Sequence, residues 1–163
     1  MRKTLFALVV TALASSSAMA NTATSTIAVE VENRAITLTN VQGLNFGVIL
    51  PFGRVGSVTV NTAGAVSVNS AHVTDASNIS ASSWAVSGVP NAPYQVTLPG
   101  SATITNGTEN MTVNAFTRTG GSTQLSLDAG GNASFNVGAT LVVGTNQPAG
   151  VYSGNFSVTV NYN

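Results

Sequence analysis

The sequence contains no cysteine, a single histidine and a single tryptophan, and only 6% of its residues are charged. Without cysteine, disulfides, thiolate metal ligands and thiol nucleophiles are all excluded. The histidine, His72, lies in a polar stretch where Asp75 is the only nearby acid, so neither a metal site nor an acid–base pair has convergent partners. Serines lack a Gly-x-Ser-x-Gly motif, and the glycine pairs precede no phosphate-binding lysine. We therefore expect a protein that is not an enzyme and uses no cofactor or metal.

Positive charge is scarce as well. Beyond the first 20 residues, three arginines stand against five carboxylates, which gives a formal charge of −2. Such a chain has no basic patch for nucleic acid or for an anionic membrane surface. Its surface must be covered by Ser, Thr, Asn and Gly, which suits a protein that packs against copies of itself.

The first 20 residues have the pattern of a secretory signal peptide. Arg2 and Lys3 are followed by an apolar run over residues 5–14, and Ala18-Met19-Ala20 ends the segment in the small-x-small pattern of a cleavage site. The run is too short for a membrane span, which takes about 20 residues, and no later segment approaches that length. We expect cleavage after Ala20, export across the inner membrane, and no membrane span in the mature chain.

The remaining sequence is a succession of short alternating segments separated by Gly, Asn, Pro and Ser. We count about nine or ten such strands, with no long amphipathic helix and no fixed repeat. The alternation predicts that Leu44, Phe46 and Val48 face inward and that residues 70–82 form an irregular or edge segment. It also predicts a hairpin over residues 56–68, a tight turn at Asn106-Gly107, and separate short strands around Phe135 and around Leu141. Residues 150–162, the longest clean alternation, are expected to form the final strand. This pattern favours an all-β, immunoglobulin-like antiparallel β-sandwich over residues 34–163.

The segment that precedes this domain is a strand with one apolar face. Ile27, Val29 and Val31 alternate with Ala28, Glu30 and Glu32, so the three apolar side chains share a face. The next apolar residues, Ile36 and Leu38, have the opposite parity, which places a bulge, turn or linker at Asn33-Arg34. Residues 21–33 are therefore predicted to be a separable strand and linker, whose acceptor is either its own domain or a neighbouring molecule.

Several of these features together resemble bacterial chaperone-usher pilins in the broad sense. They are the leader, the alternating N-terminal strand, the segment Leu44-Asn45-Phe46-Gly47, and the final Gly150-Val151-Tyr152-Ser153-Gly154-x-Phe156-x-Val158-Thr159-Val160-x-Tyr162. The chain is most similar to a Gram-negative family of unknown function akin to spore-coat-U and archaic pilins. The resemblance covers essentially the whole mature chain, although the cysteine pair of many such pilins is missing.

The resemblance implies an incomplete sandwich that lacks its last strand and is completed by donor-strand exchange. By position, Ile27, Val29 and Val31 would be the donor, and the acceptor groove would be lined by Leu44, Phe46, Phe156, Val158 and Val160. It further implies a homopolymeric cell-surface fimbria that supports adhesion or biofilm formation, with a periplasmic chaperone and an outer-membrane usher as possible partners.

A second hypothesis is a secreted, monomeric binding module whose loops around Trp84 or Tyr94 recognise a surface carbohydrate. In that case residues 25–32 fold back as an ordinary strand of their own domain. The two aromatic residues offer a stacking platform for a sugar, but a core position is the commoner use of a tryptophan in a sandwich. The two hypotheses differ in where the first strand pairs.

Overall fold

The computed structural model describes residues 28–29, 34–51, 53–121 and 124–163. The chain divides into two units, residues 1–32 and residues 33–163. The predicted leader and the candidate donor residues Ile27 and Val31 lie outside the described residues. Val29 is described and is 83% exposed.

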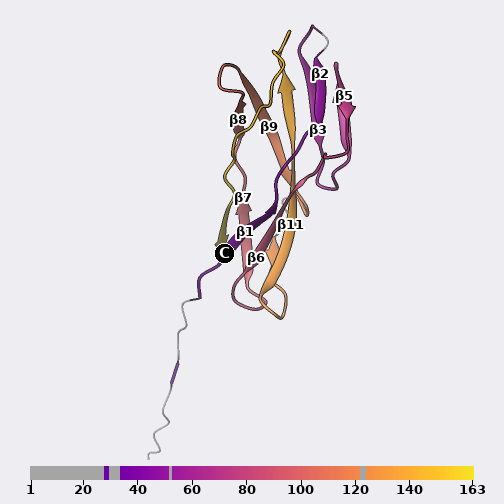
Figure 1. Cartoon of the computed structure of the whole chain (residues 1–163). Coiled ribbons are helices and arrows are strands. Elements are labelled where there is room, and N and C mark those ends of the chain that lie inside the picture. The colour runs from indigo at the N-terminus through magenta and orange to yellow at the C-terminus, as the bar shows by residue number, and fades with distance from the viewer. Residues whose placement is uncertain (1–27, 30–33, 52, 122–123) are drawn as a thin grey trace, which may run out of the picture. The chain divides into compact units, whose positions relative to one another are not determined.

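The second unit is built from antiparallel strands, and no helix occurs in the part of the chain that is described (Figure 1). This confirms the predicted all-β class. The strands are β1 Thr37–Gln42, β2 Val48–Pro51, β3 Gly56–Val60, β4 Val66–Asn69, β5 Ala71–Asp75, β6 Ser82–Ser87, β7 Pro93–Thr97, β8 Ser101–Thr105, β9 Asn110–Arg118, β10 Leu125–Ser126, β11 Asn132–Val143 and β12 Thr159–Tyr162.

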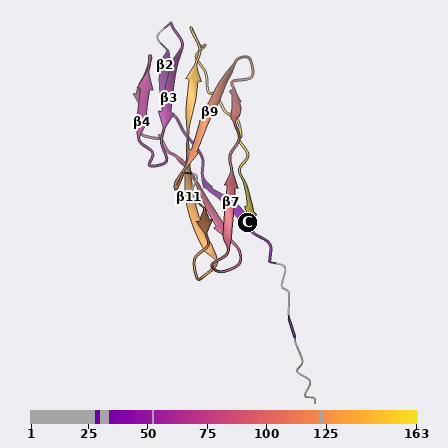
Figure 2. The same ribbon diagram turned by 180° about the vertical axis from the view of Figure 1, so that it is seen from behind.

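The largest sheet is organised around the long strand β11, which runs through the middle of the domain (Figures 1 and 2). Its first half pairs with β6, which in turn pairs with β1; its second half pairs with β3, which pairs with β4. On its other side β11 pairs with β9, and β9 with β8. A second sheet has the order β10-β7-β12, and β2 pairs with β5 in a third.

The core lies on one face of β11 because every second residue of that strand is apolar and buried. Phe135 and Val137 belong to a cluster with Val86, Tyr94 and Leu127 between the β6–β11 region and the second sheet. Further along the strand, a second cluster comprises Val113, Ala139, Leu141 and Val143. The domain therefore has two apolar centres along a single strand.

Three sequence predictions need correction. Val48 does not face inward: Gly47 has φ +78, which reverses the alternation, so Ile49 is half-buried and Val48 is 56% exposed. The stretch 70–82, expected to be an irregular or edge segment, does contain an edge strand, β5, which pairs with β2 in a two-stranded sheet. The two short strands expected around Phe135 and Leu141 are one strand, β11. The expected long strand over 150–162 forms a ladder only in β12, after an isolated bridge between Ser153 and Thr105.

Candidate functional site

Several strands of the domain have a ladder partner on one side only, and two of them, β1 and β12, come near each other. β1 pairs with β6 and β12 pairs with β7, and neither has a second partner within the described ranges. They are the edges of two different sheets, and at their closest approach Cα atoms of β1 and β12 lie within 8 Å of one another. Each edge therefore presents backbone N–H and C=O groups that another strand can use.

Half-buried apolar side chains follow both edges. They pack against the buried cluster around Val86 and Phe135 without being covered themselves. We call this set the edge strip; its members are Ile36 and Leu38 near and in β1, and Phe156, Val158, Val160 and Tyr162 in and before β12.

Trp84 of β6 lies beside the edge strip. Its backbone is opposite Asn40 of β1, and its ring packs edge-on against Phe156 at a centroid distance of 6.0 Å. Phe156 also contacts Phe116, at 5.0 Å. The indole Nε1 of Trp84 is buried without a hydrogen-bond partner in the described structure. An unsatisfied buried donor of this kind costs about 1–3 kcal/mol.

The five residues predicted to line an acceptor groove fall into two places. Phe156, Val158 and Val160 are together in the edge strip, packed on the cluster around Phe135. Leu44 and Phe46 instead pack on the second cluster, around Leu141. Phe116 packs against both clusters and is the residue that links them.

Sequence reasoning missed three members of the strip. Tyr162 shares the parity of Val160 but was not assigned to the groove. Ile36 and Leu38 were recognised as the apolar face of their strand, but no local signal indicated that this strand would be an edge beside β12. The tertiary pairing of β1 with β6 decides this, because it leaves the other side of β1 open.

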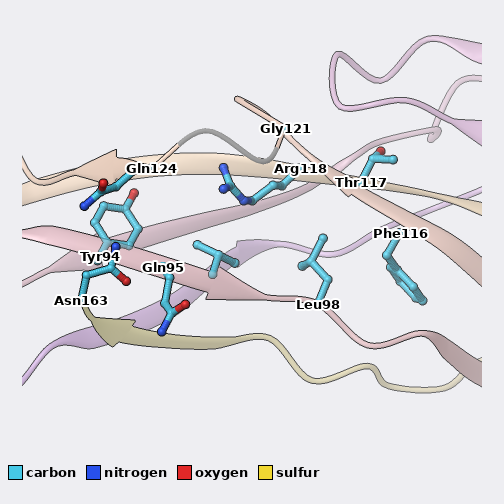
Figure 3. A pocket seen from close by; sticks show the side chains of 10 residues that line it. Tyr94, Gln95, Leu98, Phe116, Thr117, Arg118, Gly121, Gln124 and Asn163 are labelled. Carbon is cyan, nitrogen blue, oxygen red and sulfur yellow. The ribbon is translucent and has the colours of Figure 1, made fainter.

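A separate cleft of about 550 Å³ opens between β7 and β9. Figure 3 shows Tyr94 and Gln95 on β7 and Leu98 just after it, with Thr117 and Arg118 of β9 across from them. Tyr94 is only 1% exposed, and burial raises the pKa of its hydroxyl above the ordinary value of 10, an effect that the charge of Arg118 partly opposes. Tyr94 is therefore buried, whereas Trp84 is half-buried, with its ring packed against Phe156.

Within the described ranges, no three His, Cys, Asp or Glu side chains lie close enough to share a metal ion. His72 is exposed on β5, and the side chain of Asp75 accepts a hydrogen bond of 2.8 Å from the backbone of Ser77. Among the described residues there is no helix long and apolar enough to cross a membrane.

Comparison with known proteins identifies a family but no activity. The profile of a domain of unknown function (DUF4402) matches residues 36–162, which is nearly the whole second unit. No curated protein and no solved structure shows a significant match to the chain.

Proposed function

We propose that this chain, which belongs to the DUF4402 family, is the structural subunit of a cell-surface fimbria. In this proposal residues 21–33 of one subunit add as a strand to the open edges of the next, and the subunits polymerise head to tail. The observation that carries the proposal is the pair of edges β1 and β12, with half-buried apolar side chains along both.

The N-terminal segment has the chemistry that these edges require. Its alternation places Ile27, Val29 and Val31 on one face, to pack on the edge strip, and Glu30 and Glu32 on the other, toward water. Main-chain pairing contributes roughly 0.5–1.5 kcal/mol per hydrogen bond, and each buried β-branched side chain contributes about 1.5–3 kcal/mol. Strand addition of this kind is an established mode of peptide recognition.

Insertion between β1 and β12 requires the two edges to part. A strand inserted between β1 and β12 would hold them about 9.6 Å apart, which is twice the spacing of neighbouring strands. At their closest, however, Cα atoms of β1 and β12 lie within 8 Å of one another. The cost of parting is offset by the new ladders. A subunit without an added strand would expose open edges during export and could aggregate through them. The proposed partners therefore include a periplasmic chaperone and an outer-membrane usher.

A head-to-tail contact of this type does not close on itself, so it generates a filament rather than a ring of fixed size. The proposed location is the cell surface, reached by way of the N-terminal leader, and the proposed role is adhesion or biofilm formation.

Deleting residues 21–32 from the mature chain tests the proposal. The truncated domain should stay monomeric in sedimentation and bind a synthetic peptide of residues 21–33. Trp84, the only tryptophan, lies beside Phe156, so its fluorescence should report the binding. Head-to-tail exchange is wrong if the truncated domain does not bind the peptide. It is also wrong if the full mature chain is a monomer whose N-terminal segment pairs in register with its own domain.

Two aspartate variants of the synthetic peptide sharpen the test because they place the same charge on opposite faces of the predicted strand. Val29→Asp should weaken peptide binding by about 100-fold or more, because a carboxylate buried in the apolar strip costs about 3 kcal/mol or more. Ala28→Asp, on the water-facing side, should bind within a few-fold of the unmodified peptide. Equal loss in both variants would contradict the assigned faces.

A further inference from the structure

The strand β4 forms another open edge, far from the edge strip in the strand order. It pairs with β3 alone, and all four of its residues are exposed. Val66 and Val68 stand opposite Val60 and Val58, both of which are 0% exposed, yet they are themselves 37% and 49% exposed. The apolar row that crosses the sheet from Leu141 through Val58 thus continues onto an uncovered edge.

This edge lacks the features that normally prevent association. Residues 55–74 contain no Asp, Glu, Lys or Arg and no proline. Soluble proteins commonly protect edge strands with charges, prolines or bulges, and β4 pairs with β3 without a register shift. By contrast, β2 ends in Pro51 and its ladder with β5 contains an irregularity.

The direction of the free backbone groups follows from the hairpin. Asn61 donates its N–H to the carbonyl of Ala65, and hydrogen-bonded pairs alternate with open pairs along an antiparallel ladder. Ser67, opposite Thr59, therefore directs its N–H and C=O toward β3. The N–H and C=O groups of Val66 and Val68 point to the open side.

We propose that β4 pairs antiparallel with β4 of a second copy of this chain, about a two-fold axis through Ser67. Val66 of each copy then lies opposite Val68 of the other, and about four main-chain hydrogen bonds join them. The sequence Val66-Ser67-Val68 reads the same in both directions, so this register keeps every valine on the core-facing side. Registers centred on Val66 or Val68 place only one outward-facing valine opposite a strand residue of the other copy, so they form fewer main-chain hydrogen bonds within the strand.

The second copy is the occupant that the chemistry favours. An isologous contact places a surface against a copy of itself, so a surface with net charge of one sign would repel its copy; β4 and its flanking loops carry no Asp, Glu, Lys or Arg. The contact is small and would be weak between single molecules. Arrayed subunits, as in a filament, would multiply it through avidity and join neighbouring assemblies side by side. The pairing uses a different edge from the proposed head-to-tail contact and does not depend on it.

Cysteine cross-linking tests the register, since the natural sequence has no cysteine to interfere. Open antiparallel pairs have Cα atoms about 4.5 Å apart, within the range for a disulfide. The mature Ser67→Cys chain should form a covalent dimer on mild oxidation. Ser134→Cys, an exposed serine on the central strand β11, is the matched control and should cross-link at least tenfold more slowly.

Lysine substitutions separate edge pairing from random collision. In the Ser67→Cys background, Val66→Lys combined with Val68→Lys should slow cross-linking at least tenfold, because four like charges meet at the axis. Val151→Lys, at a position that is 88% exposed and away from β4, should leave the rate unchanged. Thermal unfolding confirms that each variant is folded.

The same cross-link should form when Val29→Asp removes the head-to-tail contact. Pairing through β4 can therefore be tested even if the proposed head-to-tail exchange is wrong. Pairing through β4 is overturned if Ser67→Cys cross-links no faster than Ser134→Cys. It is equally overturned if the paired lysines have no effect, or if cross-linking requires an intact N-terminal strand.

Discussion

The hydroxyl oxygen of Tyr162 accepts a hydrogen bond of 2.8 Å from the backbone N–H of Val89. This contact joins the end of β12, in the second sheet, to the loop that follows β6 in the first. Gly88 makes it possible, because a Cβ at that position would overlap the Tyr162 hydroxyl and lie 3.1 Å from a methyl group of Leu127. One tyrosine thus fixes the end of an otherwise open edge strand.

Tyr162→Phe should lower the free energy of unfolding by about 1 kcal/mol, because the Val89 N–H loses its acceptor. Gly88→Ala should cost more, about 1–3 kcal/mol, since the added methyl displaces the ring. Urea denaturation measures both. Wild-type stability in Gly88→Ala would show that the Tyr162 contact is not needed to hold β12.

Gly138 occupies the point where β11 changes neighbours. Val137 pairs with the start of β6, and Ala139 pairs with the end of β3. A Cβ on Gly138 would overlap the carbonyl oxygen of Val60, so Gly138→Ala should destabilise the domain by about 1–3 kcal/mol. Gly100→Ala is the matched control: nothing lies within 4 Å of its Cβ position, and its unfolding midpoint should hardly move. Similar midpoints for the two variants would contradict this account.

Leu141 is 2% exposed and lies between β3 and β9 in the second cluster. Leu141→Ala should lower the free energy of unfolding by about 2–5 kcal/mol, from lost burial and the cavity left behind. Leu50→Ala makes the same chemical change on an exposed part of β2, where the side chain is 51% accessible, and should cost less than about 1 kcal/mol. Comparable losses would mean that Leu50 is covered in solution.

Tyr94 predicts a loss of stability in alkali. Burial is the main reason that the pKa of its hydroxyl is raised above 10, so the folded state holds this proton more tightly than the unfolded chain. The stabilising effect is complete below pH 10, the ordinary pKa, and is lost as pH rises from there through the higher folded-state pKa. The melting temperature of the wild type should fall in that range, and Tyr94→Phe should fall less steeply. If the melting temperatures of the wild type and of Tyr94→Phe fall equally steeply with pH, Tyr94 is not the cause of the alkaline loss of stability.

Local features of the sequence predicted the hairpins well. Val58 and Val60 do pair with Val68 and Val66 in β3–β4, and Asn106-Gly107 lies in the connection between β8 and β9. The side-chain oxygen of Asn106 accepts the N–H groups of Thr108 and Glu109, which closes that loop. Such turns are set by neighbouring residues, so a single sequence contains the information.

Strand parity was predicted less well wherever one residue reverses it. Gly47 does so before β2, and Ala115, with φ +50, does so within β9, where it accompanies a register shift opposite Gly138 and Thr140. On either side of this bulge the inward residues change from Val113 to Phe116. An alanine gives no local signal for a left-handed conformation, because only the surrounding sheets impose it.

The acceptor groove stays a prediction. Phe156, Val158 and Val160 share a parity and pack against one buried cluster. Their expected neighbours Leu44 and Phe46 belong to the other cluster, and Ile36 and Leu38 occupy the edge across from them. Alternation identifies which side chains of one strand share a face, but says nothing about which strands meet.

By itself the sequence determined the all-β class, the turns and the apolar rows, because each depends on residues close together in the chain. Only the tertiary structure decided that β1 joins β6, that β12 joins β7 and that β4 stays at the border of its sheet. Ladders join residues distant in sequence through backbone groups that all residues share, so their partners, and the edges left open, emerge only when the whole domain is packed.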